Sequence, residues 1–429
     1  MVKPKAVIWL VRDTIRLADN PALETAVSWA QTAGASVIPL ACLEPRRWLD
    51  QQFGLPRVGS HWTQFRVESL LDLEVQLSEF GSPLWISSAS PDRALDEIAQ
   101  GFHVVGVVTD LPLATEERIE NAQLVSEGYA VRALETDDLF RMAQMPFELD
   151  ALPESFTRFR KAVEKAPAIR PNAPRPVPTF LSTSEPLWPR PVEWDEAVAS
   201  LTMASDSRFA GGRRAGLSHW SNYLASGALS TYKATRNAFM GEHVWSSLSP
   251  WLAHGCLSVR EVWADILAYE ARVGANESTY WLRFELLWRE YFRWYARATD
   301  WTLFRKQGPE GREVPGDFNR DRFVQWRDGL TGSDIVDASM RELKATGWIC
   351  NRARQLVASH AIYESGLDWR LGAAWFESAL VDHDVASNWG NWAYIAGVGA
   401  DPRGGRVFNL EAQADRYDPE GVYRRRWLS

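Results

Sequence analysis

The chain of 429 residues is longer than one ordinary hydrophobic core, so we expect two or three domains. Its 46% hydrophobic and 24% charged residues are typical of a globular protein, and no stretch approaches 18 uninterrupted apolar residues, which excludes a transmembrane helix. The net charge of −8 is unevenly distributed: residues 1–150 carry 12 Lys and Arg against 22 Asp and Glu, so the remainder carries +2 and can still present a basic face to phosphates.

Three cysteines, Cys42, Cys256 and Cys350, lie far apart in the chain and have no partner at metal-ligand spacing. This pattern predicts reduced thiols, no disulfide framework and no structural metal. The N-terminus has no long apolar run followed by a small-residue cleavage site, so we expect no signal peptide and a cytoplasmic protein. The unusual number is 22 tryptophans, for which a large aromatic core is the simplest interpretation.

The first 140 residues alternate between two periods. A helical pattern opens at Asn20-Pro21, where an N-cap precedes a proline, and another covers about 60–80. Between the helices stand short apolar runs rich in β-branched residues, at 6–11, 36–43, 83–88, 103–110 and 130–135. This alternation predicts an α/β domain with a doubly wound, parallel, five-stranded sheet. The sheet has neither GxGxxG nor a Walker A sequence, so it lacks the usual means of holding a dinucleotide.

Eight prolines between about 165 and 191 predict an extended connector, because proline removes donors and stiffens the chain. From about 208 onward, apolar residues recur every three or four positions, which predicts helices throughout. We therefore assign 1–140 to the α/β domain, 141–207 to a proline-rich connector and 208–429 to a large all-α domain.

The segment WLRFELLWREYFRW (281–294) places Glu285, Trp288, Arg289 and Phe292 within one or two helical turns. A charged pair among bulky aromatics costs desolvation energy unless it is paired or faces a polar ligand. For the segment taken alone, an amphipathic helix that carries an ordinary salt bridge is the simpler interpretation.

The segment NRARQLVASH (351–360) gathers Asn351, Arg352, Arg354 and Gln355 at the start of a helix. Polar groups at a helix start suit anion binding, and Arg354 is a candidate partner for a buried carboxylate. A solvated basic turn is the alternative.

Residues 368–399 are the most informative segment. Asp382 and Asp384 flank a histidine at the end of an apolar helix, and Asn388 follows. Next comes an aromatic cluster formed by Trp389, Trp392 and Tyr394. Such a set suits a pocket for a flat heterocycle with polar edges. A metal site is the competing interpretation, but adjacent residues rarely face one ion together and no further ligands cluster nearby, so we expect no metal.

The segment WSSLSPWLAHGCLS (245–258) has Ser246, Ser247 and Ser249 just before a helix that opens at Pro250. Hydroxyls and free backbone N–H groups at a helix start are placed to hold phosphate. Simple helix capping is the alternative.

These segments together resemble the photolyase/cryptochrome family, and within it the cryptochrome DASH subgroup. The likeness begins with WLVRDTIRLADNPAL (9–23), continues through TYKATRN (231–237) and ends with QADRYDPEGVYRRRWL. Gln355, Tyr394 and the run SNWGNWAY point to the DASH subgroup rather than to a common bacterial photolyase.

The resemblance implies a U-shaped FAD in the helical domain. Its cofactor-binding positions correspond to Tyr232, Ser246, Ser247, Leu248, Ser249, Glu285, Arg289, Asn351, Arg354, Asp382, Asp384 and Asn388. A flipped-out pyrimidine dimer would be lined by Glu285, Trp288, Asn351, Arg352, Gln355 and Tyr394.

The implied activity is that of a deoxyribodipyrimidine photo-lyase. Reduced flavin excited by blue light passes an electron to a cyclobutane pyrimidine dimer, preferentially in single-stranded DNA, where extrusion of the dimer costs least. Glu285, Trp288 and Asn388 would be catalytic, while Trp392 and Trp369 would carry electrons. We expect a monomer that binds DNA. A blue-light receptor with little or no repair activity is the alternative, and a flavin-free helical interaction protein is a third possibility.

Two departures from the family pattern lie in the helical domain. Gly211-Gly212-Arg213 stands where Gly-Gly-Glu is common, which reverses a charge. Gly316 falls where the outer member of a tryptophan triad is expected. The exit of that electron-transfer chain would then be another aromatic residue, such as Trp326, Phe318 or Trp348.

A third departure concerns a light-harvesting antenna. Relatives often bind methenyltetrahydrofolate in the α/β domain, with a glutamate just after the fourth strand. Here Asp110 occupies that position, and Glu116-Glu117 follow shortly after. The side chain of aspartate is shorter than that of glutamate and would hold a folate less well, so the sequence leaves open whether a folate is bound.

Overall fold

The computed structural model describes residues 2–43, 51–113, 115–166, 169–179, 186–201, 208–400 and 404–429. Pro167 of the connector lies outside these ranges. The N-terminal sheet contains five strands, β1 (Lys5–Val11), β2 (Ser36–Cys42), β5 (Trp85–Ser87), β6 (His103–Asp110) and β7 (Val131–Leu134). Their order is β5-β2-β1-β6-β7 and every pairing is parallel, which confirms the predicted sheet. The sequence did not predict a short antiparallel pair, β3 (Gln51–Gln52) and β4 (Leu55–Pro56).

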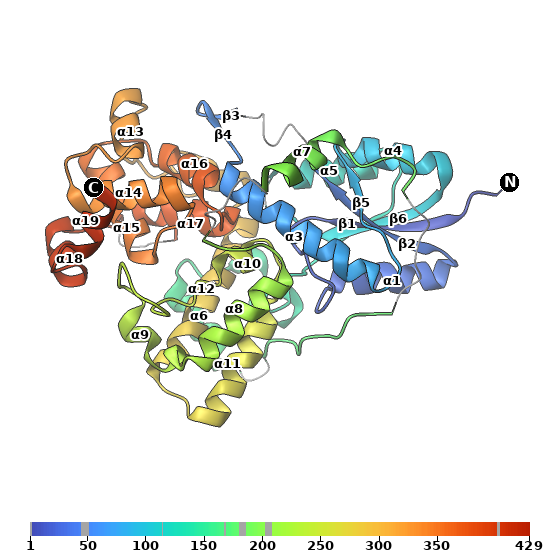
Figure 1. Cartoon of the computed structure of the whole chain (residues 1–429), viewed down its shortest axis with the longest axis horizontal. Helices are drawn as coiled ribbons and strands as arrows, with labels where there is room; N and C mark the ends of the chain where they lie inside the picture. Colours follow the sequence, from blue (N-terminus) through green and yellow to red (C-terminus); the bar gives the residue numbers. More distant parts are fainter. Residues whose placement is uncertain are drawn as a thin grey trace.

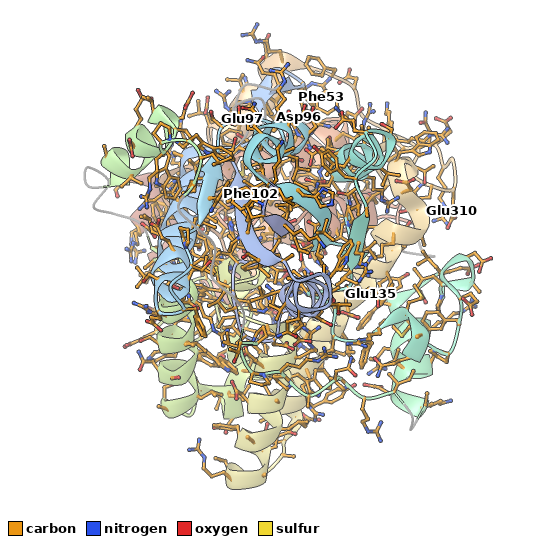
Figure 2. All side chains as sticks on the ribbon, turned by 90° about the vertical axis from the view of Figure 1, so that its right-hand side faces the viewer. Phe53, Asp96, Glu97, Phe102, Glu135 and Glu310 are labelled. Carbon is orange, nitrogen blue, oxygen red and sulfur yellow. The ribbon has the colours of Figure 1, made fainter. Side chains whose placement is uncertain are left out.

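Helices cover the sheet on both faces (Figure 1). They are α1 (Pro21–Ala33), α3 (Ser60–Ser78), α4 (Pro91–Gly101) and α5 (Thr115–Ser126). Asn20 caps α1 as predicted, since the Leu23 N–H donates to Asn20 Oδ1 at 3.0 Å. Phe102, labelled in Figure 2, follows α4 and packs edge-on against Trp85 of β5, with ring centroids 5.8 Å apart. In Figure 1, α3 runs between the sheet and the helical domain.

The connector is not uniformly extended. It contains α6 (Phe156–Lys165) and α7 (Val192–Leu201), together with short helical turns at Met142–Gln144 and Leu149–Ala151. Between α6 and α7, the described residues 169–179 and 186–191 form neither helix nor strand, as the prolines predict.

The C-terminal domain is helical, as predicted, and its longest helix, α12 (Glu277–Thr299), packs against α17 (Val385–Ala396) and α9 (Tyr232–Thr235). Aromatic side chains fill its core, and Trp301 is the one tryptophan of the described chain that is exposed. The other helices are α8 (Arg213–Ala225), α9 (Tyr232–Thr235), α10 (Ser249–Ala253), α11 (Val259–Val273), α13 (Arg320–Arg327), α14 (Asp334–Thr346), α15 (Asn351–Ser359), α16 (Trp369–Ala379), α17 (Val385–Ala396), α18 (Leu410–Tyr417) and α19 (Val422–Leu428).

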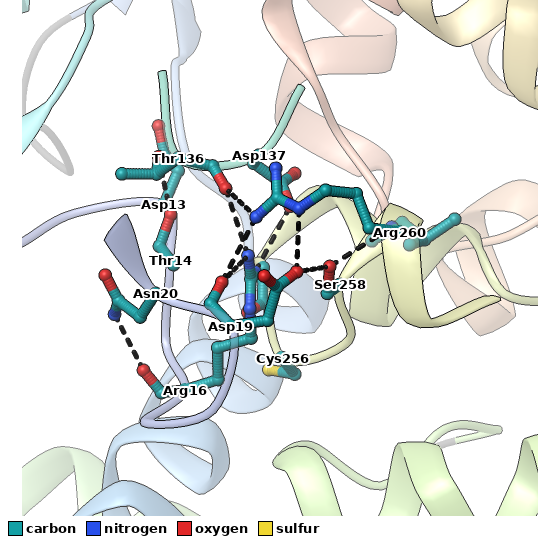
Figure 3. A network of polar contacts seen from close by, with 12 residues as sticks. Asp13, Thr14, Arg16, Asp19, Asn20, Thr136, Asp137, Cys256, Ser258 and Arg260 are labelled. Carbon is teal, nitrogen blue, oxygen red and sulfur yellow. Dashed lines mark hydrogen bonds and ion pairs between the residues drawn. The ribbon is translucent and has the colours of Figure 1, made fainter. Parts of the chain in front are cut away.

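Two buried arginines join the N-terminal segment to the helical domain (Figure 3). Arg260, in the first turn of α11, donates from Nε to Asp19 Oδ2 at 2.8 Å and from Nη2 to the Thr136 carbonyl at 2.8 Å. Arg16 donates to the Gly255 carbonyl at 2.8 Å and to the Asp19 carbonyl at 3.0 Å. Charge-assisted bonds of this kind are strong when they are buried and satisfied, so this network holds the two domains in one orientation.

The structure explains how an arginine is accommodated at Gly211-Gly212-Arg213, where the family commonly has a glutamate. Gly212 has φ of +95°, and a Cβ there would lie 2.6 Å from Cβ of Asp72 on α3, so the turn needs glycine. Arg213 then donates from Nη1 and Nη2 to the two carboxylate oxygens of Glu261 on α11, at 2.9 and 2.8 Å. The bidentate pair balances the arginine and ties α8 to α11.

Glu342 on α14 makes stability depend on pH. Burial raises the pKa of Glu342 from 4.5 to about 7, although the Tyr423 hydroxyl donates to it at 2.7 Å. Between those two values the folded protein holds a proton that the unfolded chain releases, so stability falls as pH rises through this window, by about 3 kcal/mol in total. Glu342→Gln should remove that part of the slope, because the amide still accepts the hydroxyl without ionising. Urea unfolding at pH 5 and pH 8 measures it; an unchanged difference between the two pH values in the variant would contradict the assignment.

Candidate functional site

One cavity of about 270 Å³ lies among α9, α10, α12, α15 and α17. It gathers residues that are far apart in the sequence, and Trp245, Trp348 and Phe376 add aromatic walls. Of the residues predicted from the sequence, its lining includes Tyr232, Ser246, Ser247, Leu248, Ser249, Glu285, Asn351, Arg354, Gln355, Asp382, Asp384, Asn388 and Trp392.

Arg354 and Asp382 form an ion pair in the wall of this cavity. Arg354 Nη2 donates to Asp382 Oδ2 at 2.8 Å and to Oδ1 at 3.1 Å, and its Nε donates to the Ile349 carbonyl at 2.9 Å. The Asp382 side chain is only 1% exposed. The guanidinium is therefore held in one orientation beside the cavity, and the predicted pairing of Arg354 with a buried carboxylate is present.

The start of α17 positions Asp384 and Asn388. Asp384 caps the helix, accepting from the Ser387 N–H at 2.7 Å, and Asn388 Nδ2 donates to the Ala373 carbonyl of α16 at 2.9 Å. Burial opposes ionisation of Asp384, but Arg289, Arg293 and the Ser387 hydrogen bonds outweigh it and lower the pKa of Asp384. Asp384 is therefore a fixed anion at the edge of the cavity.

The serine loop before α10 is held in an unusual conformation. Ser247 has φ of +49°, a left-handed conformation that is uncommon for a residue with a side chain. His219 lies 2.8 Å from the Ser246 carbonyl oxygen, and Trp348 Nε1 donates to Ser249 Oγ at 3.4 Å. Ser246, Ser247 and Ser249 of this loop all line the cavity, and hydroxyls just before a helix suit phosphate binding.

Glu285 reaches the cavity from α12 and meets an arginine that the sequence reasoning missed. Arg236 Nη2 lies 2.9 Å from Glu285 Oε1, and the two residues are far apart in the sequence. Burial raises the pKa of Glu285, an effect that the positive charge of Arg236 partly offsets. Within the described chain, Arg236 Nε is buried without a hydrogen-bond partner, so this wall suits a polar ligand. The run TYKATRN contained Arg236, but its partner is set by the tertiary fold.

Two of the predicted substrate residues lie beside the cavity rather than in its wall. Trp288 is stacked on Phe156 of α6, with centroids 3.8 Å apart and planes 14° apart, and Tyr394 meets its edge at 5.7 Å. Arg406 donates to the Tyr394 hydroxyl. Sequence reasoning missed Phe156, because nothing in the connector indicates that it covers Trp288.

Arg352 and Arg289 also lie outside the cavity lining. Arg352 Nη1 donates to Gln355 Oε1 at 3.0 Å, which links it to a residue of the wall. Arg289 Nη1 donates to the Asp137 carbonyl at 2.9 Å, and its Nη2 donates to the Asp137 carboxylate and to the Leu252 carbonyl at 3.2 Å, so its hydrogen bonds join the segment after β7 to α10. A role for Arg289 in cofactor binding stays a prediction.

Two of the three tryptophans expected for an electron-transfer chain are present, and the third is not. Trp392 lines the cavity, and Trp369 is buried on α16, where its indole N–H donates to the Lys306 carbonyl at 2.9 Å. At Gly316, φ is +109° and a Cβ would lie 2.4 Å from the Leu367 carbonyl oxygen. No side chain fits at this position, so the backbone itself excludes an outer tryptophan there.

A second cavity, of about 360 Å³, lies between the two domains. Asp110 at the end of β6 and Glu116 of α5 line it from one side, and Glu377, His383 and Asp384 line it from the other. Asp110 Oδ2 accepts from the Asp13 N–H at 3.0 Å, and burial raises the pKa of Asp110. Carboxylates outnumber cations in this lining, which suits a ligand with N–H donors or positive charge.

Among the described residues no group of His, Cys, Asp and Glu could hold a metal ion. No helix in the described ranges is long and apolar enough to cross a membrane.

Comparison with known proteins gives consistent matches. The family model for the FAD binding domain of DNA photolyase matches residues 281–429, and the model for DNA photolyase matches residues 6–179. Cryptochrome DASH of Idiomarina loihiensis is 41% identical over 98% of this chain and 92% of its own length. Cryptochrome DASH of Natronomonas pharaonis is 40% identical over 99% of this chain and 90% of its own.

Solved structures agree with these matches. The crystal structure of a Synechocystis cryptochrome superposes with a TM-score of 0.90 at 34% identity, covering 100% of this chain and 89% of the other. A class III photolyase from Agrobacterium tumefaciens superposes with a TM-score of 0.83 at 28% identity, covering 100% and 87%. The chain therefore belongs to the photolyase/cryptochrome family, and the two curated relatives described above, which match it over nearly its full length, are proteins named cryptochrome DASH.

Proposed function

We propose that this protein repairs cyclobutane pyrimidine dimers in single-stranded DNA by light-driven electron transfer from reduced FAD. The observation that carries the proposal is that one cavity combines a set suited to a flavin with a set suited to a pyrimidine dimer. Arg354, Asp382 and Asn388 form the first set, and Glu285 and Gln355 belong to the second.

The donor set of the cavity fits FAD. Arg354 and Asp382, which hold each other in place, offer a hydrogen-bond donor and an acceptor to the polar atoms of a flavin ring. The serines of the loop before α10 offer hydroxyls to the phosphates of FAD. Asp384 would hold the ribose or the edge of the ring. When bound, reduced FAD supplies the photoexcited electron that opens the cyclobutane ring.

The protein groups would then bind and orient the dimer. Since burial raises the pKa of Glu285, its carboxyl is closer to its neutral, hydrogen-bond-donating form than an exposed glutamate. It would donate to a carbonyl oxygen of the dimer, with Arg236 holding it in place at 2.9 Å. Asn351, Arg352 and Gln355 would contact the neighbouring base edges and backbone.

The interdomain cavity supports a methenyltetrahydrofolate antenna. A pterin ring presents N–H donors that a buried carboxylate such as Asp110 accepts, and a methenyl folate carries positive charge that the acidic lining favours. Asp110, Glu116 and Glu377 are the residues we assign to this role. Fluorescence of an extract from the purified protein tests for a bound folate.

A blue-light receptor that binds DNA without repair is the second candidate, and one observation favours it. Phe156 covers one face of Trp288 at a centroid distance of 3.8 Å, so the ring cannot stack on a base through that face. Repair by way of Trp288 would use the edge beside Tyr394 or would require α6 to move.

Illumination of the reduced protein with dimer-containing oligonucleotides distinguishes the two functions. In the unaltered protein we expect loss of dimer, faster in single strands than in duplex. In Glu285→Ala we expect a repair rate that is lowered roughly tenfold or more, because the variant loses the hydrogen bond to the dimer, on which negative charge develops during repair. Glu270→Ala on α11 is a matched control, because Glu270 pairs with Arg283 away from the cavity. No loss of dimer in either substrate would favour the receptor.

A further inference from the structure

Three buried tryptophans lie on α16 and α17, and one of them lines the flavin cavity. Trp392 lines the cavity on α17, and Trp389 lies three residues earlier on the same helix, a spacing that brings side chains into proximity. Trp369 on α16 meets Trp389 at a centroid distance of 5.8 Å. Trp389 therefore lies about one helical turn from Trp392 and in ring contact with Trp369.

Trp389 differs from its neighbours in its hydrogen-bond partner. Its indole N–H donates to Glu377 Oε2 at 2.8 Å, whereas that of Trp369 donates to a backbone carbonyl. The Glu377 side chain is 5% exposed, and Arg57 Nε donates to its other oxygen at 2.9 Å. His383 lies 3.9 Å from the oxygen that accepts from Trp389. A buried carboxylate on an indole N–H stabilises positive charge on the ring and provides a base for its proton.

The other aromatics near the cavity are less suited to hold a positive charge. Two guanidinium groups lie near the ring of Trp348, Arg208 at 4.2 Å and Arg354 at 5.9 Å from its centroid, and their charges oppose oxidation of the ring.

In the part of the chain that the structure describes, Trp326 and Phe318 also lack a carboxylate that accepts a hydrogen bond from the ring. Trp326 meets Trp392 at 5.9 Å, but its indole N–H donates to the Val357 carbonyl, which cannot take a proton. Phe318 is 61% exposed, and a benzene ring is much harder to oxidise than an indole.

We propose that Trp389 is the terminal electron donor when light reduces the oxidised flavin, and that Glu377 takes its indole proton. The inference rests on flavin binding as given under the proposed function, but not on repair. One electron passes from Trp392 to the photoexcited oxidised flavin, which is the oxidant. One electron then passes from Trp389 to Trp392, directly or through Trp369. The N–H bond of the oxidised Trp389 breaks, its electron pair stays on the ring and the proton goes to Glu377 Oε2. The products are a neutral indole radical and a neutral carboxyl.

Protonation of Glu377 leaves no buried cation without a partner, because Arg57 also pairs with Glu116. Glu377 and His383 both line the interdomain cavity, which gives the proton a polar route away from the radical. Charge recombination with the flavin is thereby slowed.

Transient absorption of the oxidised holoprotein after a light flash tests the proposal. In the unaltered protein, we expect a tryptophan cation radical that converts to a neutral radical, more slowly in heavy water. Glu377→Gln keeps an acceptor for the indole N–H but cannot take the proton, so the neutral radical should fall about tenfold and the solvent isotope effect should vanish. Trp389→Phe should abolish the long-lived neutral radical while the first electron transfer from Trp392 remains.

Trp220→Phe is the matched control, since Trp220 is buried and donates to a carboxylate, Asp265 at 2.9 Å, on helices away from this path. It should behave as the unaltered protein does. A full yield of neutral radical in Trp389→Phe at equal flavin content would overturn the proposal, as would an unaltered isotope effect in Glu377→Gln. Repair by chemically reduced Trp389→Phe protein is measured separately. That assay reports on the proposed repair function and does not involve Trp389, so the two can fail independently.

Discussion

Asp382→Asn should yield a folded protein that is purified without flavin. The substitution leaves the Arg354 guanidinium beside the cavity without the carboxylate that now accepts from it at 2.8 and 3.1 Å. Loss of hydrogen bonds to a charged group costs about 1.5–3 kcal/mol, which corresponds to a roughly ten- to hundredfold loss of affinity for a ligand that needs the pair intact. The ratio of flavin to protein absorbance after purification and a titration of the flavin-free protein with FAD measure the loss.

Asp321→Asn is the control for this variant, because it removes a carboxylate from the exposed first turn of α13. It should retain the flavin content of the unaltered protein. A yellow Asp382→Asn protein with unaltered affinity would show that the pair does not hold the flavin. Far-ultraviolet circular dichroism separates that outcome from failure to fold.

Arg260→Met should destabilise the whole protein by about 3–5 kcal/mol, because it leaves the buried Asp19 carboxylate without its arginine. The same change removes the donor to the Asp138 carbonyl and one of two donors to the Thr136 carbonyl, since Arg16 still donates to Thr136 at 3.2 Å. Methionine fills a similar volume, so the loss reports on polar contacts rather than on a cavity. Urea unfolding followed by fluorescence and by circular dichroism measures it.

Arg272→Met, at the exposed end of the same helix, is the matched control and should change stability by less than about 1 kcal/mol. Arg260→Lys should recover only part of the loss, since an ammonium group cannot reproduce the spread of donors of a guanidinium. If Arg260→Met unfolds at the same urea concentration as Arg272→Met, the network in Figure 3 does not hold the domains together.

Local patterns in the sequence predicted the elements well. Period and turn residues located β1, β2, β5, β6 and β7, because a buried parallel strand reads as a short apolar run between helices. The cap at Asn20 and the polar start of α15 depend only on nearby residues. Polar runs at 245–258, 351–360 and 382–388 likewise indicate a binding site from local composition and spacing. Which heterocycle the site takes came from the family resemblance and not from those runs.

The tertiary structure decided the pairings between distant segments. Arg236 with Glu285, Phe156 on Trp288 and Arg213 with Glu261 each join residues whose separation no local pattern encodes. The short β3–β4 pair was missed because two-residue strands carry no period.

The tryptophans show the same division. By itself, the sequence determined that there are 22 of them, that most lie in the helical domain and that Gly316 replaces an expected ring. Only the folded chain shows that the backbone at 316 has no room for a side chain and that the indole N–H of Trp389 donates to a buried carboxylate. The ease with which an indole is oxidised depends on the charges around it, and those charges come from Glu377 and Arg57, which meet only when α16 packs beside the loop after β4.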